Sequence, residues 1–563
     1  MAQDAYRFGP FLFDASGRRL QRDGRDIPLQ PRVFDTLAYL VEHAGRAITK
    51  EELIANLWRR RVVTDDVLTR CIKELRHVLR DDARAPLYIR SLPRVGYSFI
   101  ARLEKHPSTH TPLAIAVLPF GPLVADERDE ELELGIPDAI INGLSGIHGV
   151  VVRPLAAVRK YVGLDDPLEA GREQHADVVI EGNLQRVKNN LRVTVRVLRV
   201  ADATALLAQR FDERLEDVFE LQDSICRRIV DALALQLSQP ESTRLTRHLA
   251  QDPAAWHFYL LGRLRVDKHT PEDDRRSIEC FERAVEQDGA YALAWAGLAD
   301  AYESLGTLGA EPGNFVKARE CAMRALELDP DLVPALTCLG KISWEHEWDW
   351  PAAERHLKRA IAFGPSVAEA HLAYSDFCAY QRRYQEAIAS ASHALQIDPT
   401  SPWVSALLAQ SLHMAGRHEE AVAQAKRALT GVPDFAFAHL FLALALVMQG
   451  QYADGVAHLE KARALSGRVD LVGALGYAYA MAGKANEARG LLSGLEKEGA
   501  PPIVLALVHL GLREDDRALD LLEHAAQQRD WHVLLLHAEP IFTPLRDHPR
   551  TLRLLKQMGV AGY

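Results

Sequence analysis

The chain has 563 residues, of which 48% are hydrophobic and 26% charged, and its formal net charge is −10. This length is too great for one hydrophobic core, so it predicts about three or four domains. Charge is unevenly distributed. Residues 1–105 hold 20 Lys and Arg against 14 Asp and Glu, a net charge of +6, which leaves −16 for residues 106–563. A basic head on an acidic body predicts a polyanion-binding first segment joined to domains that do not bind polyanions.

The composition also argues against several classes of protein. Six cysteines are scattered without a C-x-x-C pair, which disfavours a zinc site or a disulfide framework and favours a reducing cytoplasm. The N-terminus lacks the pattern of a signal peptide. The two best apolar stretches, residues 113–125 and 435–448, are too short or too interrupted to span a membrane. We therefore expect a cytoplasmic protein with no metal, no cofactor and no membrane partner.

The first hundred residues predict a small sheet followed by helices. Short alternating segments over residues 6–30 are separated by Ser-Gly and Asp-Gly, which are hairpin-turn signals. A first helix is expected over residues 31–45, because a proline opens it and apolar residues recur at helical spacing. A second helix begins after Thr49, which forms a capping box with Glu52.

The third predicted helix, residues 64–80, is strongly amphipathic. Four apolar residues at i, i+4, i+7 and i+11 form one stripe: Leu68, Ile72, Leu75 and Leu79. Six polar residues fall on the far side of the helix or on its margin: Thr69, Arg70, Lys73, Arg76, His77 and Arg80. A strand-turn-strand pattern over residues 87–100 follows, so the order is sheet, three helices and hairpin.

In this order the elements resemble the OmpR/PhoB-type winged-helix DNA-binding domain. The matching motifs are "TKEELIANLW", "VVTDDVLTRCIKELRHVLRDD" and "YIRSLPRVGYSFI", in which an arginine beside Val-Gly-Tyr is typical of the family's wing. The resemblance implies a winged helix-turn-helix (α+β) domain over residues 1–105 whose partner is double-stranded DNA. It also implies contacts to DNA from eight residues: Thr69, Arg70, Lys73, Arg76, His77, Arg80, Arg94 and Tyr97.

Two features of the head leave alternatives open. Glu74 stands where the family often has a second basic residue, and it either accepts a hydrogen bond from cytosine N4 or pairs with a neighbouring arginine. The loop that contains Arg59, Arg60 and Arg61 implies, by resemblance, a contact with RNA polymerase. Three arginines fit contacts to DNA phosphates equally well.

A polar linker, residues 106–112, leads to a second predicted domain at residues 113–240. Strand and helix patterns alternate there and end in "ADVVIEGNLQRVKNNLRVTVRVLRV", which predicts paired strands with a turn at residues 188–190. The pattern is typical of an α/β sandwich. "AVLPF" and "VIEGNLQRV" are similar to the TolB N-terminal-like domain, and this resemblance carries over no catalytic residue.

The rest of the chain is repetitive. Four prolines close apolar helix pairs at intervals of 35, 34 and 34 residues: Pro330, Pro365, Pro399 and Pro433. Nine alanines recur at matching offsets before them: Ala318, Ala322, Ala325, Ala387, Ala391, Ala394, Ala421, Ala425 and Ala428. The interval is that of tetratricopeptide (TPR) repeats, and small residues let stacked helices approach closely. We predict an all-α solenoid of seven or eight repeats over residues 250–530 and a terminal cap over residues 531–563.

Catalytic motifs are incomplete. "GLSGIHG" departs from G-x-S-x-G at Ile147, and "GYAYAMAGKA" has the wrong spacing for a phosphate loop. Trp344, Trp348 and Trp350 either line a ligand groove or pack inside an irregular repeat. We therefore expect a non-enzymatic, multidomain regulator with a layout like that of HilA-like activators. Its winged helix would read DNA sequence, and its TPR tail would bind a protein partner or a second copy of the chain. The alternative is a TPR scaffold whose basic head binds a protein or an anionic surface without reading sequence.

Overall fold

The computed structural model describes residues 4–14, 19–22, 25–27, 29–57, 65–92, 95–107, 112–123, 128–164, 166–187, 189–214, 217–235, 237, 241–242, 252–266, 271–307, 313–466 and 470–560. The chain divides into two compact units. The first comprises residues 1–127, 136–152 and 176–248, and the second comprises residues 128–135, 153–175 and 249–563.

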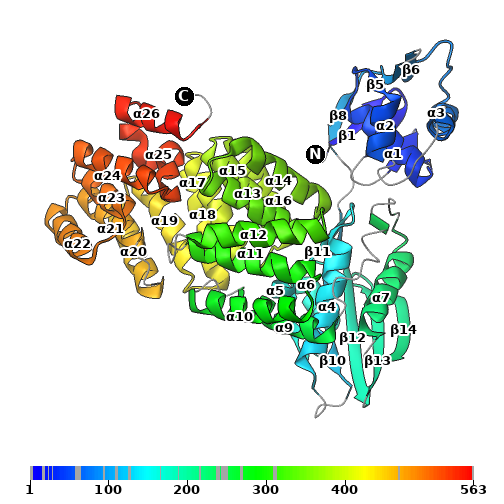
Figure 1. Ribbon diagram of the computed structural model, residues 1–563, viewed down its shortest axis with the longest axis horizontal. Helices are drawn as coiled ribbons and strands as arrows, with labels where there is room; N and C mark the ends of the chain where they lie inside the picture. Colours follow the sequence, from blue (N-terminus) through cyan, green and yellow to red (C-terminus); the bar gives the residue numbers. More distant parts are fainter. Residues whose placement is uncertain are drawn as a thin grey trace. The chain divides into compact units, whose positions relative to one another are not determined.

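The head at the N-terminus of the first unit contains two antiparallel sheets and three helices (Figure 1). The larger sheet has the order β4-β3-β2-β1-β8, with β1 (Asp4–Phe8), β2 (Phe11–Asp14), β3 (Arg19–Arg22), β4 (Arg25–Asp26) and β8 (Glu104–Pro107). The smaller has the order β5-β7-β6, with β5 (Ile48–Thr49), β6 (Ile89–Leu92) and β7 (Gly96–Phe99). The helices are α1 (Pro31–Glu42), α2 (Lys50–Leu57) and α3 (Asp65–Leu79). The predicted order of sheet, three helices and hairpin is confirmed.

Local signals in the sequence position these helices. Proline stands at the first position of α1, where a helix needs no backbone N–H donor. Before α2, the Thr49 hydroxyl accepts a hydrogen bond of 3.1 Å from the backbone N–H of Glu52, which satisfies one orphan donor of the first turn. The apolar stripe of α3 is fully buried and packs in one core with Phe8 and Phe99 from the two sheets. The core therefore fixes which face of α3 points outward.

The end of the head differs from the prediction. The first two residues of the predicted linker, His106 and Pro107, lie in β8, which pairs with β1 so that Ala5 stands opposite His106. Without β8 the edge of β1 would expose a row of unpaired backbone groups. Strand pairing in the head therefore extends to Pro107, two residues beyond the predicted boundary at Lys105.

The second domain contains a mixed sheet with the order β11-β9-β12-β13-β14, and β10 also pairs with β12. The strands are β9 (Leu113–Val117), β10 (Gly121–Pro122), β11 (Val150–Val152), β12 (Val178–Val187), β13 (Asn190–Arg199) and β14 (Ala205–Arg214), and the flanking helices are α4 (Glu130–Ser145) and α7 (Val218–Ala232). β12 and β13 form the predicted hairpin, with Val187 opposite Asn190. Alternate residues of β13 are buried, so one face of the sheet packs against the domain core.

The second unit contains eight consecutive helix pairs within the described ranges. The pairs are α9 (Pro253–Val266) and α10 (Pro271–Gln287), α11 (Ala292–Thr307) and α12 (Asn314–Leu328), α13 (Val333–Glu345) and α14 (Trp350–Phe363), α15 (Ala368–Tyr380) and α16 (Tyr384–Ile397), α17 (Pro402–Met414) and α18 (His418–Gly431), α19 (Ala436–Met448) and α20 (Tyr452–Ser466), α21 (Asp470–Met481) and α22 (Ala485–Glu498), and α23 (Pro502–Gly511) and α24 (Asp515–Gln527). This agrees with the predicted solenoid.

Small side chains bring the paired helices together as predicted. The nine alanines at matching offsets are all buried, eight of them completely. The first helices of successive pairs also contact one another, from α9 to α11 and onward to α19. We call these first helices the inner helices. Nearly every residue in the middle of α13, α15 and α17 is buried, so these inner helices are covered on all sides.

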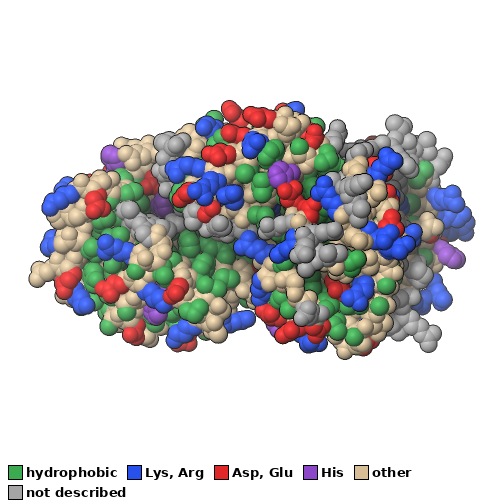
Figure 2. All heavy atoms as spheres, turned by 90° about the horizontal axis from the view of Figure 1, so that it is seen from below, with side chains coloured by type: hydrophobic (Ala, Val, Ile, Leu, Met, Phe, Trp, Pro, Cys, Tyr) green, Lys and Arg blue, Asp and Glu red, His purple; other side chains and the backbone are tan. Residues whose placement is uncertain are grey.

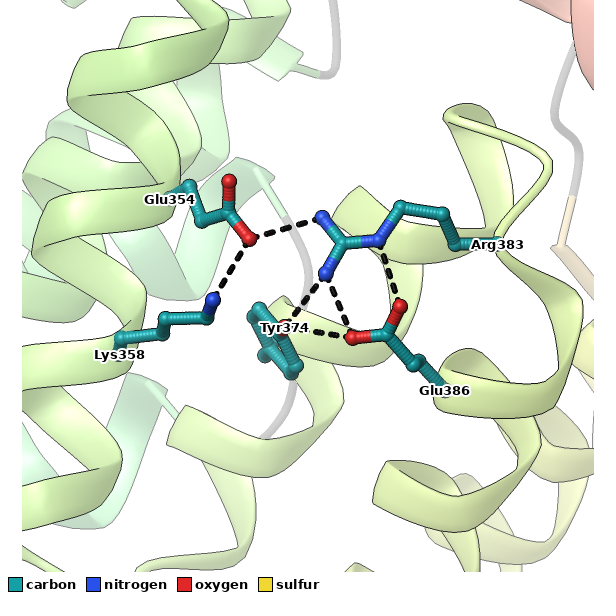
Figure 3. Close-up of polar contacts among 5 residues, drawn as sticks. All are labelled: Glu354, Lys358, Tyr374, Arg383 and Glu386. Carbon is teal, nitrogen blue, oxygen red and sulfur yellow. Dashed lines mark hydrogen bonds and ion pairs between the residues drawn. The ribbon is translucent and has the colours of Figure 1, made fainter. Parts of the chain in front are cut away.

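Polar contacts add to the packing between the third and fourth pairs (Figure 3). Arg383, in the turn before α16, donates to Glu386 on α16, to the Tyr374 hydroxyl on α15 at 2.9 Å, and to Glu354 on α14 at 2.9 Å. Lys358 is also paired with Glu354, at 2.8 Å. One guanidinium thus ties three helices of neighbouring repeats together.

Two segments that interrupt the second domain in sequence belong to the second unit. The segment after β11 contains α5 (Leu155–Val158) and α6 (Pro167–Glu173). Arg153 opens it and is only 3% exposed. Its guanidinium donates to the carbonyl oxygens of Gln174 and His175, just after α6, and to those of Gln396 and Ile397, at the end of α16. Arg153 therefore satisfies the C-terminal ends of two helices that are far apart in sequence.

The chain ends in four short elements: η3 (Trp531–Leu534), α25 (Leu535–Ala538), η4 (Pro540–Leu545) and α26 (Pro549–Gln557). We call residues 531–560 the closing segment. It does not simply cover the last helix pair, because α25 contacts α15 of the fourth pair. The segment folds back across the inner helices in the middle of the solenoid (Figure 1).

Candidate nucleic-acid interface

The outer face of α3 is polar and mostly basic. Five of the six polar residues predicted for this face are exposed, namely Thr69, Arg70, Lys73, His77 and Arg80, and Arg76 is half-buried. In Figure 2, Lys and Arg side chains gather toward the right of the view, the side on which Figure 1 draws α3. The predicted orientation of the helix is therefore confirmed. Basic side chains on one helix face are suited to the acceptor-rich major groove and to phosphates.

Two residues attach the hairpin β6–β7, which corresponds to the wing, to the end of α3. The buried carboxylate of Asp81 accepts hydrogen bonds from the backbone N–H groups of Leu87, Tyr88 and Ile89, at 2.7, 3.2 and 2.8 Å. Arg76 donates to the Ile89 carbonyl at 3.0 Å and to the Ser91 hydroxyl at 2.9 Å. The helix and the first strand of the wing are therefore held in a fixed relation.

The remaining predicted contact residues are placed differently. Arg76 reaches the wing strand, so at least part of its hydrogen-bonding capacity is used within the head. Tyr97 lies on β7 with its side chain only 7% exposed, packed in the core of the head, apart from the exposed face of α3. Arg94 and the three arginines Arg59, Arg60 and Arg61 lie outside the described residues.

The sequence interpretation missed two residues of this region. Asp81 lies two residues after the end of α3 and anchors the wing, but an aspartate after a helix gives no sign that its carboxylate will be buried. Arg90 is exposed on β6 between the buried Ile89 and the half-buried Leu92. The alternation of the hairpin did contain a signal for it, because a residue next to a buried strand residue points outward.

Other kinds of site find little support in the described ranges. No group of three or more His, Cys, Asp or Glu side chains there is arranged to hold a metal ion. No helix among the described residues is long and apolar enough to cross a membrane. On the inner side of α3, burial raises the pKa of the Cys71 thiol, so this cysteine is suited to packing and not to nucleophilic chemistry.

Four family models match segments of the chain. Residues 24–99 match the C-terminal domain of transcriptional regulatory proteins, and residues 111–228 match the second domain of HilA/YgeH-like transcriptional regulators. Residues 349–402 and 379–445 match tetratricopeptide repeats. The chain therefore combines a DNA-binding domain of transcriptional regulators, a HilA/YgeH-like second domain and TPR repeats. The predicted winged helix and TPR repeats are confirmed, and the likeness of the middle domain to TolB stays a prediction.

Curated relatives and one solved structure are similar to parts of this chain. The transcriptional regulator HilA of Salmonella typhi is 25% identical over 411 residues, which is 70% of each chain. The transcriptional activator CadC of Escherichia coli K12 is 39% identical over 101 residues, 18% of this chain and 20% of CadC. The solved DNA-binding domain of Escherichia coli CadC is 34% identical and covers 19% of this chain and all of that domain, with a TM-score of 0.17.

Proposed function

We propose that this HilA-like regulator binds DNA sequence-specifically through the outer face of α3, and that its repeat tail contacts a protein partner or a second copy of the chain. The observation that carries the proposal is the exposed basic face of α3, held opposite a fully buried stripe in a head with a net charge of +6. The relatives support it, because HilA and CadC are both named as transcriptional regulators.

The proposed contacts follow from the chemistry of the exposed side chains. With α3 in the major groove, the Arg70 guanidinium can bind guanine O6 and N7 together, and a good bidentate contact contributes about 1–3 kcal/mol of discrimination between bases. Lys73 on this face and Arg80, just beyond the C-terminal end of α3, are exposed and can neutralise phosphates. Glu74 is half-buried on α3, between the buried stripe and the exposed face. The proposal therefore keeps both of its roles, as a hydrogen-bond acceptor for cytosine N4 and as the partner of a neighbouring arginine.

The test begins with selection of bound fragments from random DNA by the full chain. Affinity is then measured by fluorescence anisotropy on the selected and on scrambled sites, at several salt concentrations. We expect Arg70→Ala to reduce discrimination at one or two base positions by about 1–3 kcal/mol. Arg102→Ala serves as the control, because Arg102 is also exposed but lies outside α3. Equal, salt-sensitive binding to all sequences would reject sequence readout and favour the scaffold with an anion-binding head.

The proposal for the tail rests on its repeats and on its charge. Residues 250–563 carry a net charge of −10, which disfavours contact with nucleic acid. Stacked repeats instead offer an extended surface suited to proteins. Sedimentation of the full chain over a range of concentrations separates self-association from a requirement for a different partner.

A further inference from the structure

The inner helices of the second to fifth helix pairs are covered by the closing segment. Val533, Leu536, Phe542 and Leu545 of the segment are at most 2% exposed. They belong to the same apolar cluster as residues of α13, α15 and α17. Trp531 lies with its ring centroid 6.2 Å from that of Tyr380 on α15. The surface that stacked repeats usually leave open to solvent is therefore occupied by the chain itself.

Polar contacts hold both ends and the middle of the segment. The indole N–H of Trp531 donates to the carbonyl of Thr307, at the end of α11, at 3.3 Å. The indole N–H of Trp350 on α14 donates to the carbonyl of Met558 at 2.9 Å. These contacts join residues more than 200 positions apart in sequence.

The middle of the segment is held by a buried polar pair. Glu539 Oε1 lies 2.7 Å from Nε2 of His413 on α17, and both side chains are almost completely buried. Just before Glu539, the Ala538 carbonyl accepts a hydrogen bond of 3.4 Å from the hydroxyl of Tyr384 on α16. A polar pair in an apolar surrounding requires its partner, so Glu539 specifies where the segment sits.

These contacts differ in kind from those between repeats. Repeats pack through buried alanines on regular helices, such as Ala387 and Ala421. The closing segment instead consists of short turns interrupted by Pro540 and Pro544, and indole and phenol groups bond to main-chain carbonyls across its contact with the helix pairs. Side chains that bind main-chain groups of an irregular segment are typical of peptide recognition.

Docking of the closing segment on the inner helices is reversible because two contributions to its free energy oppose each other. Burial of apolar side chains favours docking, whereas ordering an irregular segment of this length costs conformational entropy of similar size. The net affinity is then modest, and the covalent connection after α24 keeps the segment bound by holding it at a high effective concentration. A separate peptide of matching chemistry can compete only if it is present at a comparable concentration.

We propose that the inner surface of the second to fifth repeats is a peptide-binding groove that the chain's own closing segment occupies, so that a protein partner binding there must displace this segment. The fitting partner is a peptide that presents an aromatic side chain and, about eight residues later, a carboxylate, as Trp531 and Glu539 do. The proposal names the regulation of the tail and so rests on its proposed role in protein contact, but not on DNA binding.

The experiment uses the full chain with a protease site inserted in the exposed turn at Gln528–Arg529. After cleavage, a fluorescent synthetic peptide of residues 530–560 is added without DNA. We expect the labelled peptide to replace the cut segment, seen as a rise in anisotropy and as release of the unlabelled fragment in size-exclusion chromatography. The same peptide with Glu539→Ala should bind at least about tenfold more weakly, because His413 loses its buried partner.

A peptide with Arg553→Ala is the matched control, since Arg553 is exposed, and it should bind like the unchanged peptide. Two results overturn the proposal. The first is a cut segment that never exchanges while the helical signal of the repeats is intact, which would make it a permanent part of the core. The second is loss of that helical signal when the segment leaves, because a groove must stay folded without its occupant. Neither result bears on sequence readout by α3.

Discussion

At the scale of single residues, Asp81 shows how one buried carboxylate positions a surface that it does not itself form. Its two oxygens accept three backbone hydrogen bonds from the start of the wing strand. In Asp81→Ala these N–H groups lose their acceptor, so we expect the hairpin to lose about 2–4 kcal/mol of protection. Hydrogen exchange of residues 87–99 in the full chain measures this loss, and DNA affinity should fall in parallel.

The neighbouring Asp82 provides the control for this prediction. It is exposed and accepts one hydrogen bond, of 2.9 Å, from the backbone of Arg84 in the same turn. Asp82→Ala should therefore change protection of the wing by less than about 1 kcal/mol. Equal effects of the two substitutions would show that the buried carboxylate does not anchor the wing.

Gly96 illustrates what a residue's identity can and cannot reveal. Gly96 is the last residue of the turn "PRVG", where a glycine usually indicates a positive φ. The backbone of Gly96 does not adopt a positive φ. A Cβ atom there would instead lie 2.0 Å from the carbonyl oxygen of Ile48 in the adjacent strand β5. The sequence marks the position, but the reason depends on a strand about fifty residues away.

At the scale of secondary-structure elements, Arg153 caps α6 and α16 together. Without its guanidinium, four carbonyl oxygens at two helix ends lose a donor. We expect Arg153→Ala to lower the free energy of local opening by about 2–4 kcal/mol in both places, because buried acceptors are left unpaired. Hydrogen exchange at residues 170–176 and 394–400 should rise together.

Arg172 is the matched control in the same segment. Its side chain is 60% exposed and, among the described residues, pairs with the exposed Asp166 at 3.2 Å. Such a pair contributes about 0–1 kcal/mol, so Arg172→Ala should leave exchange at residues 394–400 unchanged. If Arg153→Ala raised hydrogen exchange only at residues 170–176, Arg153 would not couple the stability of α6 to that of α16.

The network around Arg383 predicts a pH dependence of the solenoid. Hydrogen bonds from Lys358 and Arg383 lower the pKa of Glu354, and the hydrogen bond from Arg383 lowers that of Glu386. A carboxyl whose pKa is lowered in the folded state contributes stability above its unfolded pKa, and this contribution is lost as the pH falls through the lowered value. The contribution should therefore be present at neutral pH and disappear below the ordinary glutamate value of 4.5.

The measurement is urea unfolding of the full chain, followed by circular dichroism at about pH 6 and about pH 3.5. Arg383→Met should reduce the difference in unfolding midpoint between the two pH values. Arg417 occupies the equivalent turn one repeat later, but within the described ranges its guanidinium pairs with Glu420 alone, so Arg417→Met should have a smaller effect. An unchanged pH dependence in Arg383→Met would contradict the prediction.

Prediction from sequence succeeds for these elements where the signal is local. Pro31 marks the start of α1, Thr49 caps α2, and the 34-residue period of prolines and alanines identifies the solenoid. It fails where an element's partner is distant. Nothing near Glu104 announces that it begins a strand beside β1, and nothing near Trp531 points to Thr307. The exposed face of α3 was predictable because its period is local, whereas the anchoring of the wing by Asp81 was not.

At the scale of the whole molecule, the uneven charge predicts that DNA affinity resides in the head. A fragment of residues 1–107 should fold and bind a single DNA site within a few-fold of the full chain, because the remaining residues carry net negative charge and supply no phosphate contacts. A fragment of residues 1–103, which lacks β8, should be less stable since β1 loses its partner. Circular dichroism and anisotropy test both statements. A well-folded 1–107 fragment that fails to bind would show that the tail is needed, for example to dimerise the head.

The return of the closing segment to the second to fifth repeats also changes how the solenoid should come apart. In an open array each repeat touches only its neighbours, so unfolding can begin at either end and spread gradually. Here the C-terminal end cannot fray unless it leaves α11, α14 and α17 at the same time. The array is closed by contacts between its end and its middle, so these repeats should melt together in one steep transition, and cutting the turn after α24 should convert that transition into a gradual loss from the C-terminus.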